Sequence, residues 1–351
     1  MEKQLTLIIP TYNMERYLRT CLDSLIIDEG QQALEVLIIN DGSKDASSAI
    51  AHEYEKRMPD VFRVIDKENG NYGSCINRGL KEATGRYIKI LDADDYFDNA
   101  SLKQFLQIIA TIDTDMILTD NTIFGDNNIS KKYYGFELPT GKTLNFADHC
   151  DSLKADIQMH NVTYKRALFN LFDYYQTEGI SYTDQEWIFA PMARVHNFTY
   201  LSLPLYKYLI GREGQTISPE QILRSSSHAL KLGNDMLTMY QGALDTEPAV
   251  HNYLYFRLSR QIKSLYRIYL AEAPGLELDG LKAFDERLKT ELPELYTDCG
   301  QATMGPFIRI KYVSYWRKHQ YASQPQWFYT IFNSYTKTLL WCKHVLHIHH
   351  V

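Results

Sequence analysis

The stretch Tyr87-Ile88-Lys89-Ile90-Leu91-Asp92-Ala93-Asp94-Asp95 decides the fold of this chain. A short, mostly apolar run ends in three acids, which predicts a buried strand that delivers carboxylates to its C-terminal end. In open α/β sheets, ligands bind in the crevice outside the carboxyl ends of the strands. Two carboxylates one residue apart can hold a hard divalent cation and leave coordination positions for phosphate oxygens. The alternative is an acidic turn that begins a helix, with Asp98 or Asn99 as the N-cap.

The preceding residues predict strands that alternate with helices. Buried strands are expected at Leu5–Pro10, Glu35–Asp41, Val61–Ile65 and up to Leu91, and helices at Met14–Ile27, Asp45–Arg57 and Ser74–Ala83. Alternation of helices with continuously apolar strands is typical of a parallel, doubly wound sheet. The sequence therefore predicts an α/β fold for about the first 100 residues.

The remaining chain gives weaker patterns. We expect a helix at Ser101–Ala110, a strand at Met116–Thr119, a strand leading into a helix within Asn161–Leu168, a helix from Tyr182, and a strand-turn-strand at Phe198–Ile210 around Pro204. The pattern of residues 125–150 indicates neither helix nor strand. From Pro219 onward the periodicity is helical.

Composition limits the class of protein. The 351 residues are 45% hydrophobic and 23% charged, as in a globular protein, and the 26 tyrosines suit either a sugar- or interface-facing surface or a Tyr-rich core. Five scattered cysteines without a CxxC pair indicate a reducing compartment. We find no signal-peptide pattern and no apolar stretch long enough to span a membrane, and we expect a cytoplasmic protein.

Charge is distributed unevenly along the chain. The net charge is −6, yet residues 299–351 contain six Lys or Arg and no Asp or Glu. This region is therefore about +6, which leaves about −12 for residues 1–298. Its aromatic residues beside lysines suit an interfacial helix at the inner face of an anionic membrane. The alternative is a helical bundle that packs on the rest of the protein.

Three strand ends carry polar groups that would meet at one edge of the sheet: Pro10-Thr11-Tyr12-Asn13, Asn40-Asp41-Gly42-Ser43 and Asp92-Ala93-Asp94. Such groups could serve a base, a ribose and a metal-bound diphosphate. No GxxxxGK[ST] loop is present, and no GxGxxG follows the first strand, which argues against NTPase and dinucleotide-binding roles. We predict no nucleic-acid partner.

The segments LTLIIPTYNMERYLRTCLDSL, EVLIINDGSKDAS and ENGNYGSCINRGLKEATGRYIKILDADDYF together resemble family 2 glycosyltransferases of the GT-A fold. The resemblance covers residues 4–125 and extends more loosely to about residue 217. It implies an inverting transfer of a sugar from a nucleotide-sugar, usually a UDP-sugar, with Mg²⁺ or Mn²⁺.

The resemblance also implies roles for individual residues. Asp184 would be the general base, with Glu186 as the weaker candidate, and Asp94 with Asp92 would hold the metal, Asp95 being the less favoured ligand. The residues implied for nucleotide-sugar binding are Pro10, Tyr12, Asn13, Asp41, Asn69, Gly73, Asn77, Asp92, Arg212 and Gln215.

Two positions depart from the family pattern. Cys75-Ile76-Asn77 stands where many members have Ala-Arg-Asn, and Thr183 replaces the glutamate of a Glu-Asp pair. Each implied role has a simpler alternative: Asp184 as a helix cap, Arg212 as a solvated turn residue, and Tyr12 as a packing residue.

The sequence thus predicts a GT-A catalytic domain over residues 1–217, with a nucleotide-sugar half at 1–125 and an acceptor half at 126–217. A helical region follows at 218–351, associated with a membrane, with a partner or with the catalytic domain. We expect transfer to a hydroxyl of a glycan or lipid-linked acceptor in surface polysaccharide synthesis. A sugar nucleotidyltransferase and an inactive carbohydrate- or membrane-binding module are the alternatives. The sequence leaves the sugar and the linkage open.

Overall fold

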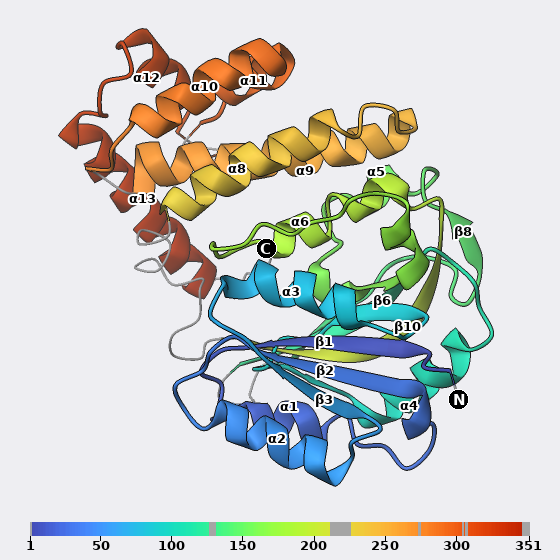
Figure 1. Cartoon of the computed structure of the whole chain (residues 1–351). Coiled ribbons are helices and arrows are strands. Elements are labelled where there is room, and N and C mark those ends of the chain that lie inside the picture. Colours follow the sequence, from blue (N-terminus) through green and yellow to red (C-terminus); the bar gives the residue numbers. More distant parts are fainter. Residues whose placement is uncertain are drawn as a thin grey trace. The chain divides into compact units, whose positions relative to one another are not determined.

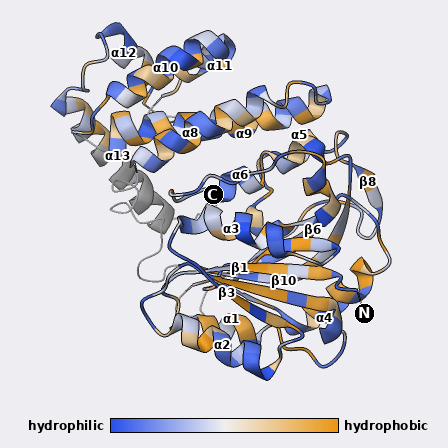
Figure 2. Ribbon diagram, in the orientation of Figure 1, coloured by the Kyte–Doolittle hydropathy of each residue, from blue (hydrophilic) through white to orange (hydrophobic). Residues whose placement is uncertain are grey.

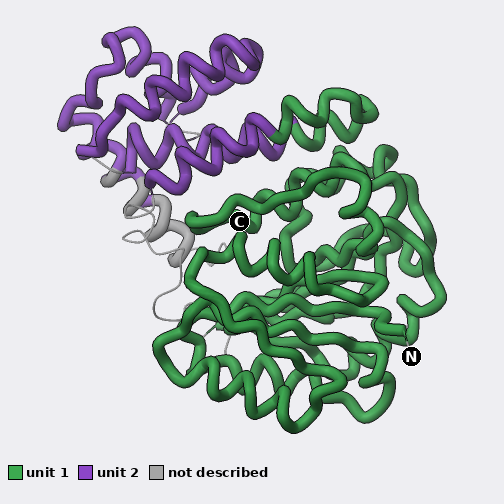
Figure 3. The backbone as a smooth tube through the Cα atoms, in the orientation of Figure 1, with its two compact units in different colours: residues 1–215, 239–254 green, residues 216–238, 255–351 purple. Residues whose placement is uncertain are grey.

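The computed structural model describes residues 2–125, 131–210, 226–272, 275–303, 305 and 308–345. The chain divides into two compact units, one of residues 1–215 and 239–254, the other of residues 216–238 and 255–351 (Figure 3). The domain boundary expected at residue 217 stays a prediction. The first unit also takes in 239–254, so the helices α8 (Ser226–Gln241) and α9 (Pro248–Arg267) each contribute to both units.

One mixed sheet forms the centre of the first unit, with strand order β3-β2-β1-β4-β9-β6-β10-β5 (Figure 1). The strands are β1 (Leu5–Thr11), β2 (Leu34–Asn40), β3 (Phe62–Asp66), β4 (Tyr87–Ile90), β5 (Tyr96–Phe97), β6 (Met116–Gly125), β7 (Lys131–Tyr134), β8 (Thr143–Asn145), β9 (Val162–Lys165) and β10 (Asn197–Ile210). β1–β4 are mutually parallel, as are β6 and β10, whereas β5, β7, β8 and β9 pair antiparallel. The mostly parallel α/β sheet confirms the predicted fold class.

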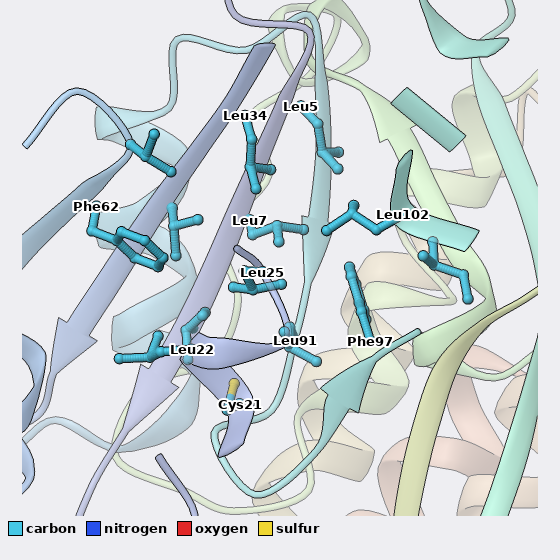
Figure 4. Packing of buried hydrophobic residues seen from close by; sticks show 14 of the residues in the cluster. Leu5, Leu7, Cys21, Leu22, Leu25, Leu34, Phe62, Leu91, Phe97 and Leu102 are labelled. Atoms are coloured by element: carbon cyan, nitrogen blue, oxygen red, sulfur yellow. The ribbon is translucent and has the colours of Figure 1, made fainter. Parts of the chain in front are cut away.

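Helices cover both faces of this sheet (Figure 1). They are α1 (Leu18–Asp23), α2 (Ser47–Arg57), α3 (Asn71–Glu82), α4 (Asn99–Ile109), α5 (Cys150–Leu153) and α6 (Asp184–Trp187). Leu5 and Leu7 of β1 point into a core shared with α1, α2 and α4, which Figure 4 shows around Leu22. Ile8 points to the other face, where an added Cβ on Gly79 of α3 would lie 2.5 Å from its Cγ2. Successive side chains of a strand point to opposite faces of the sheet, so β1 contacts a helical layer on each side.

Hydropathy follows this layering. The central strands are predominantly hydrophobic in Figure 2, and β1, β2 and β4 are almost entirely buried. Strands that are covered on both faces lose the polar-apolar alternation of a half-exposed strand. This is why continuous apolar runs in the sequence locate them.

β4 and β9 separate just before the strand end that carries the acids. Their pairing covers only Tyr87 with Lys165 and Ile88 with Tyr164. Beyond it, the buried Lys89 ammonium group donates to the carbonyls of His160 (2.7 Å) and Val162 (3.2 Å). Burial lowers the pKa of Lys89 to about 7. A side chain thus satisfies carbonyls that would otherwise bond to the neighbouring strand, and it brings His160 beside the end of β4.

The strand-turn-strand predicted around Pro204 is wrong. β10 is one strand of 14 residues, and its register with β6 shifts between Leu201 and Pro204 and again between Pro204 and Tyr206. Proline lacks the N–H that a regular ladder requires, and a bulge accommodates it without ending the strand. β10 therefore continues across the sheet to Tyr206 and Tyr208.

Other predicted elements differ in length. The helix predicted at Met14–Ile27 is shorter, because α1 spans only Leu18–Asp23, and the helix predicted from Tyr182 is the single turn α6. β6 continues to Gly125, well beyond the predicted end at Thr119. Asp98 accepts a hydrogen bond from Ser101 N at 3.0 Å and thereby caps α4. The alternative in which the acidic turn begins a helix predicted this cap.

The second unit is helical. Besides parts of α8 and α9 it contains the π-helical turn η5 (Ile268–Glu272), α10 (Asp279–Glu291), α11 (Pro293–Gly300), α12 (Tyr312–Lys318) and α13 (Gln326–Val345). A buried ion pair lies in its core: Arg317 contacts the fully buried Asp285 at 2.6 Å, and its guanidinium lies 3.5 Å from the ring centroid of Tyr296. Among the described residues, no helix is long and apolar enough to cross a membrane.

Candidate active site

The loops that follow β1 and β2 are joined by hydrogen bonds. Asn13 has a left-handed backbone (φ 53°), its side-chain oxygen accepts from Lys44 N (2.8 Å), and its own N–H donates to Ser43 Oγ (3.1 Å). Asparagine tolerates this conformation better than most residues. Tyr12, directly before it, is 46% exposed, so its ring is available to pack against a planar ligand.

Asp41, at the end of β2, is buried and held from two sides. Its Oδ1 accepts from Lys67 Nζ (2.6 Å) and from the N–H of Gly70 (3.0 Å), while Asn69 Nδ2 donates to its backbone carbonyl (2.9 Å). A charge-assisted bond and a backbone N–H fix the carboxylate in one orientation. Sequence reasoning missed Lys67, because its contact with Asp41 joins residues 26 positions apart.

A cavity of about 520 Å³ opens beside these loops. Its lining residues are Tyr12, Asn40, Gly42, Lys44, Asp66, Lys67, Glu68 and Asn69. The volume is within the range of small-molecule sites, which is about 300–1,000 Å³. Two of the residues implied for nucleotide binding therefore line one cavity, and Lys67 links that cavity to Asp41.

The acids after β4 divide into two kinds. Asp95 is buried, and its carboxylate accepts from Tyr206 Oη (2.7 Å) and Leu209 N (2.8 Å). Burial, reinforced by the neighbouring Asp94 and Asp92, raises the pKa of Asp95. Asp92 and Asp94 remain partly exposed. Asp95 thus anchors the turn to β10 by hydrogen bonds to both of its carboxylate oxygens.

Asp92 is oriented by two tyrosines. Tyr72 Oη donates to its Oδ1 (2.8 Å), and the backbone N–H of Asp92 donates to Tyr206 Oη (3.2 Å). Tyr72 lies in the first turn of α3, before the predicted start of this helix at Ser74. Nothing in the local sequence indicates that its hydroxyl reaches the end of β4.

The donor set at this turn fits a hard divalent cation. Asp92 and Asp94 offer carboxylate oxygens one residue apart, which Mg²⁺ and Mn²⁺ prefer. Among the residues that the structure describes, no group of three His, Cys, Asp or Glu side chains could enclose a metal ion. Two carboxylates leave most coordination positions to water and substrate oxygens, so the ion would be held jointly with a diphosphate.

Asp184 is the first residue of α6 and follows a strained position. Tyr182, two residues earlier, has a left-handed backbone (φ 69°), which is uncommon for a bulky side chain. Asp184 is partly exposed, and burial raises its pKa to about 6. Gln185 Nε2 donates to its Oδ2 (2.9 Å). Thr183, the N-cap residue of α6, makes no side-chain capping bond, and Asp184 lies in the first turn of this helix.

Asp184 and the acids after β4 influence the same tyrosines. Burial raises the pKa of the Tyr72 phenol, and the charges of Asp92 and Asp184 raise it further. The phenol of Tyr208 on β10 has a pKa raised by burial and then by Asp95, Asp92, Asp94 and Asp184. The charge of Asp184 and the charges of the acids after β4, which are far apart in the sequence, therefore act on the same two hydroxyls, those of Tyr72 and Tyr208.

Glu186 differs from Asp184. It is fully buried, and its two oxygens accept from the N–H and the hydroxyl of Thr177, each at 2.7 Å. A carboxylate held this way inside the protein is a structural anchor for the segment 176–178. The geometry favours Asp184 as the base.

Asn77 and Gly73 on α3 also contact the segment 176–178. Asn77 Nδ2 donates to the carbonyl of Gln176 (2.8 Å) and to Glu178 Oε1 (2.9 Å), while its Oδ1 accepts from Gln176 N (2.9 Å). A Cβ at position 73 would lie 2.0 Å from the carbonyl oxygen of Thr177. Both polar atoms of the Asn77 side chain thus bind residues 176–178, and position 73 has no room for a side chain.

The other implied residues are placed as follows. Pro10 lies in β1 beyond Ile8, the last residue that pairs with β4, so its missing N–H interrupts no bond of that ladder. Arg212 and Gln215 lie outside the described residues.

Comparison with known sequences identifies the family of this chain. The model of "Glycosyl transferase family 2" matches residues 6–172. The putative glycosyltransferase EpsH of Bacillus subtilis is 29% identical over 70% of this chain and 74% of its own length. An uncharacterized glycosyltransferase of Mycoplasma pneumoniae, the MG025 homolog, is 31% identical over 60% of this chain and 69% of its own length.

Solved structures share the fold. TarS residues 1–349 of S. aureus, in complex with UDP-GlcNAc, superposes with a TM-score of 0.61 at 18% identity, covering 95% of this chain and 92% of TarS 1–349. The mannosyltransferase PcManGT of Pyrobaculum calidifontis, in complex with GDP-Man and Mn²⁺, gives a TM-score of 0.50 at 13% identity, covering 85% and 83% of the two chains. Sequence and structure agree, and the chain belongs to glycosyl transferase family 2 and is a glycosyltransferase.

Proposed function

We propose that this enzyme transfers a sugar from a UDP-sugar to a hydroxyl of a glycan or lipid-linked acceptor, with inversion, in the synthesis of a surface polysaccharide. The observation that carries the proposal is the turn after β4, where Tyr72 and Tyr206 hold Asp92 and where Asp92 and Asp94 remain partly exposed. Asp184 is a third partly exposed carboxyl group, and burial raises its pKa to about 6. The complexes of TarS with UDP-GlcNAc and of PcManGT with Mn²⁺ support the choice of nucleotide and cation.

In this mechanism the cavity beside β1–β3 receives the nucleoside. Tyr12 packs on the base, and the carboxylate of Asp41, fixed by Lys67 and Gly70, accepts an N–H from it. Asp92 and Asp94 would hold Mg²⁺ or Mn²⁺, and the ion would neutralise charge on the leaving diphosphate. Tyr72 and Tyr206 keep Asp92 in place.

Asp184 acts at the other end of the reacting bond. It removes the proton from the acceptor hydroxyl as that oxygen attacks the anomeric carbon, and the bond from this carbon to the diphosphate oxygen breaks. The sugar has oxocarbenium character at the transition state. A single displacement from the opposite face inverts the configuration at the anomeric carbon.

A thermal-shift and turnover screen tests this function. UDP-, GDP- and dTDP-sugars are offered with and without Mn²⁺ to the wild type, to Asp94→Ala and to Asp151→Ala, an exposed acid on α5 as the control. We expect stabilisation by a UDP-sugar that requires Mn²⁺, by about 2.7 kcal/mol at a hundredfold excess over Kd. Asp151→Ala should retain this response, and Asp94→Ala should lose it.

Two results would contradict the proposal. Binding that ignores both the metal and Asp94 would remove the metal-diphosphate mechanism. Binding of a nucleotide-sugar without any turnover in the presence of glycan acceptors would favour the inactive binding module instead.

A further inference from the structure

The helix α13 of the second unit presents large apolar side chains to solvent. Trp327 is 49% exposed and Ile331 is 38% exposed. They are four positions apart, so they lie on one face of the helix. The side that faces the core of the unit consists of Phe328, Tyr329 and Phe332, which are buried. A surface helix of a globular protein normally carries polar residues on its outer face, so the exposed pair indicates a surface with a binding role.

The helix α12 extends this exposed surface. The ring centroid of Tyr315 lies 6.5 Å from that of Trp327 and 3.8 Å from that of His319. Lys318 and His319 follow Tyr315 by three and four positions, so the three side chains share one face of α12, and Lys318 and His319 are exposed. We call Tyr315, Lys318, His319, Trp327 and Ile331 the outer patch. It combines aromatic rings, an aliphatic side chain and a cation.

Packed residues support the outer patch from inside the unit. Trp316 is fully buried, and its ring centroid lies 4.8 Å from that of Tyr321 in the turn after α12. Gln324 Nε2 donates to the carbonyl of Tyr312 (2.9 Å), and the rings of Tyr312 and Phe328 lie 6.3 Å apart. These contacts fix α12 against the start of α13. The outer patch is therefore preorganised, which lowers the entropy lost on binding.

The charge of this region indicates what the outer patch would bind. Residues 299–351 contain six Lys or Arg, four of them lysines, and no Asp or Glu. Arg317 contacts Asp285 in the core at 2.6 Å, whereas Arg309, Lys311 and Lys318 are exposed. Lysine is depleted at protein–protein interfaces, but anionic lipid headgroups attract lysine and arginine alike. The charge therefore favours an anionic lipid surface over a protein partner.

We propose that the outer patch docks on the surface of an anionic phospholipid bilayer, with Trp327 and Tyr315 at the level of the headgroups and Lys318 among their phosphates. Tryptophan and tyrosine favour this level, because each has an apolar ring and a polar N–H or O–H group. Thr330 and Ser334 are exposed on the same helix, and these polar side chains keep the contact shallow. The inference concerns the helical unit and does not depend on the proposed function.

Sedimentation of the full chain with lipid vesicles tests the proposal. One set of vesicles is phosphatidylcholine alone, and in the other about a third of the lipid is phosphatidylglycerol, which supplies a negative surface. The wild type is compared with Trp327→Ser, Ile331→Ser and Lys318→Gln, and the melting temperature reports whether each variant is folded. Leu244→Ser and Lys56→Gln are the matched controls, because Leu244 is 56% exposed in the first unit and Lys56 is exposed on α2.

We expect the wild type to bind the anionic vesicles about 10-fold or more tightly than the neutral ones at low salt. Salt of about 0.5 M should remove most of this difference by screening. Trp327→Ser should weaken binding to anionic vesicles by about 10-fold, the effect of one large apolar side chain, and Ile331→Ser by somewhat less. Lys318→Gln should weaken it by about 5-fold. Both matched controls should bind as the wild type does.

Other outcomes overturn the inference. Equal binding to neutral and anionic vesicles would exclude an anionic lipid surface as the partner, and so would the absence of binding to either. Binding that the three patch variants leave unchanged, or that the matched controls weaken equally, would place the lipid contact elsewhere. Self-association of the wild type without lipid that Trp327→Ser abolishes would assign the outer patch to a second copy of this chain. Each of these results leaves the proposed function standing, because the nucleotide-sugar screen tests it separately.

Discussion

At the scale of single residues, burial separates side chains of the same type into different roles. Asp95 and Glu186 are buried, and both oxygens of each carboxylate accept hydrogen bonds from groups of the protein. Asp92, Asp94 and Asp184 are partly exposed. A buried carboxylate requires such partners to offset the cost of desolvation, and a partly exposed one retains oxygens for a ligand.

The base assignment gives the first prediction. Asp184→Asn should lower kcat by about 10²–10⁴-fold, because the amide cannot accept the acceptor's proton, and it should leave the Kd for UDP with Mn²⁺ unchanged. In the wild type, kcat/KM should rise with pH through about pH 6, since Asp184 is active when ionised and burial raises its pKa to that value. A pH profile that is flat between pH 5 and 8 would exclude Asp184 as the base.

Asp184→Asn, which should lower activity, should raise the free energy of unfolding. A carboxyl whose pKa is raised from 3.8 to about 6 on folding binds protons more tightly in the folded state. Stability of the wild type therefore falls as pH rises from about 4 to 6, and Asp184→Asn escapes this loss. We expect the variant to be more stable by about 1–3 kcal/mol at pH 8, with a smaller gain at pH 5, as measured by urea unfolding. A variant that is less stable than the wild type at pH 8 would contradict this account.

At the scale of elements, the segment 176–178 joins α3 to α6. Asn77 and Gly73 of α3 contact it from one direction, and Glu186 of α6 contacts it from another. α6 is only one turn, and helices this short have little stability of their own. The position of Asp184 therefore depends on these tertiary contacts.

This dependence predicts different outcomes for two variants of one residue. Glu186→Leu leaves the N–H and hydroxyl of Thr177 without partners and should lower the free energy of unfolding by about 1–3 kcal/mol. Glu186→Gln keeps an acceptor for the N–H, and its amide can donate to the hydroxyl, so the loss should be smaller. Transferase activity per folded molecule should survive in Glu186→Gln. Loss of activity as deep as in Asp184→Asn would instead make Glu186 the base.

At the scale of the whole molecule, the two units have separate cores. The first is organised around the sheet, and the second around helices joined by the ion pair of Asp285 with Arg317, whose side chains are 0% and 11% exposed. Tyr266 donates to the same carboxylate. A buried ion pair is weak evidence of net stabilisation, but removing one partner leaves a buried charge uncompensated.

We therefore expect Asp285→Ala to lower the free energy of unfolding by about 3–5 kcal/mol. Asp298→Ala is the matched control, since Asp298 forms a partly exposed ion pair with Lys263 at 2.7 Å and should contribute about 0–1 kcal/mol. Calorimetry in the presence and absence of UDP with Mn²⁺ checks the result. Equal losses in the two variants would show that the ion pair of Asp285 is not a core element of the second unit.

Much of the fold could be predicted from the sequence, because strands covered on both faces read as continuous apolar runs that end in polar residues. β1, β2 and β4 lie within a residue or two of the predicted ranges. The patterns that failed depend on long-range pairing. β10 passes through Pro204 because β6 pairs with it on either side of the bulge, and α1 is shorter than its apolar periodicity indicated.

The sequence by itself determined which carboxylates stand at strand ends, since a strand's C-terminal residues are local features and parallel strands end at one edge. Only the tertiary structure decided how each of them is used. Tyr72 reaches Asp92 across 20 residues, Lys67 reaches Asp41 across 26, and Tyr206 reaches Asp95 across 111. Burial and hydrogen bonding are properties of the packed chain, so only the structure shows that Asp95 and Glu186 are anchored inside the protein, whereas Asp94 and Asp184 remain partly exposed.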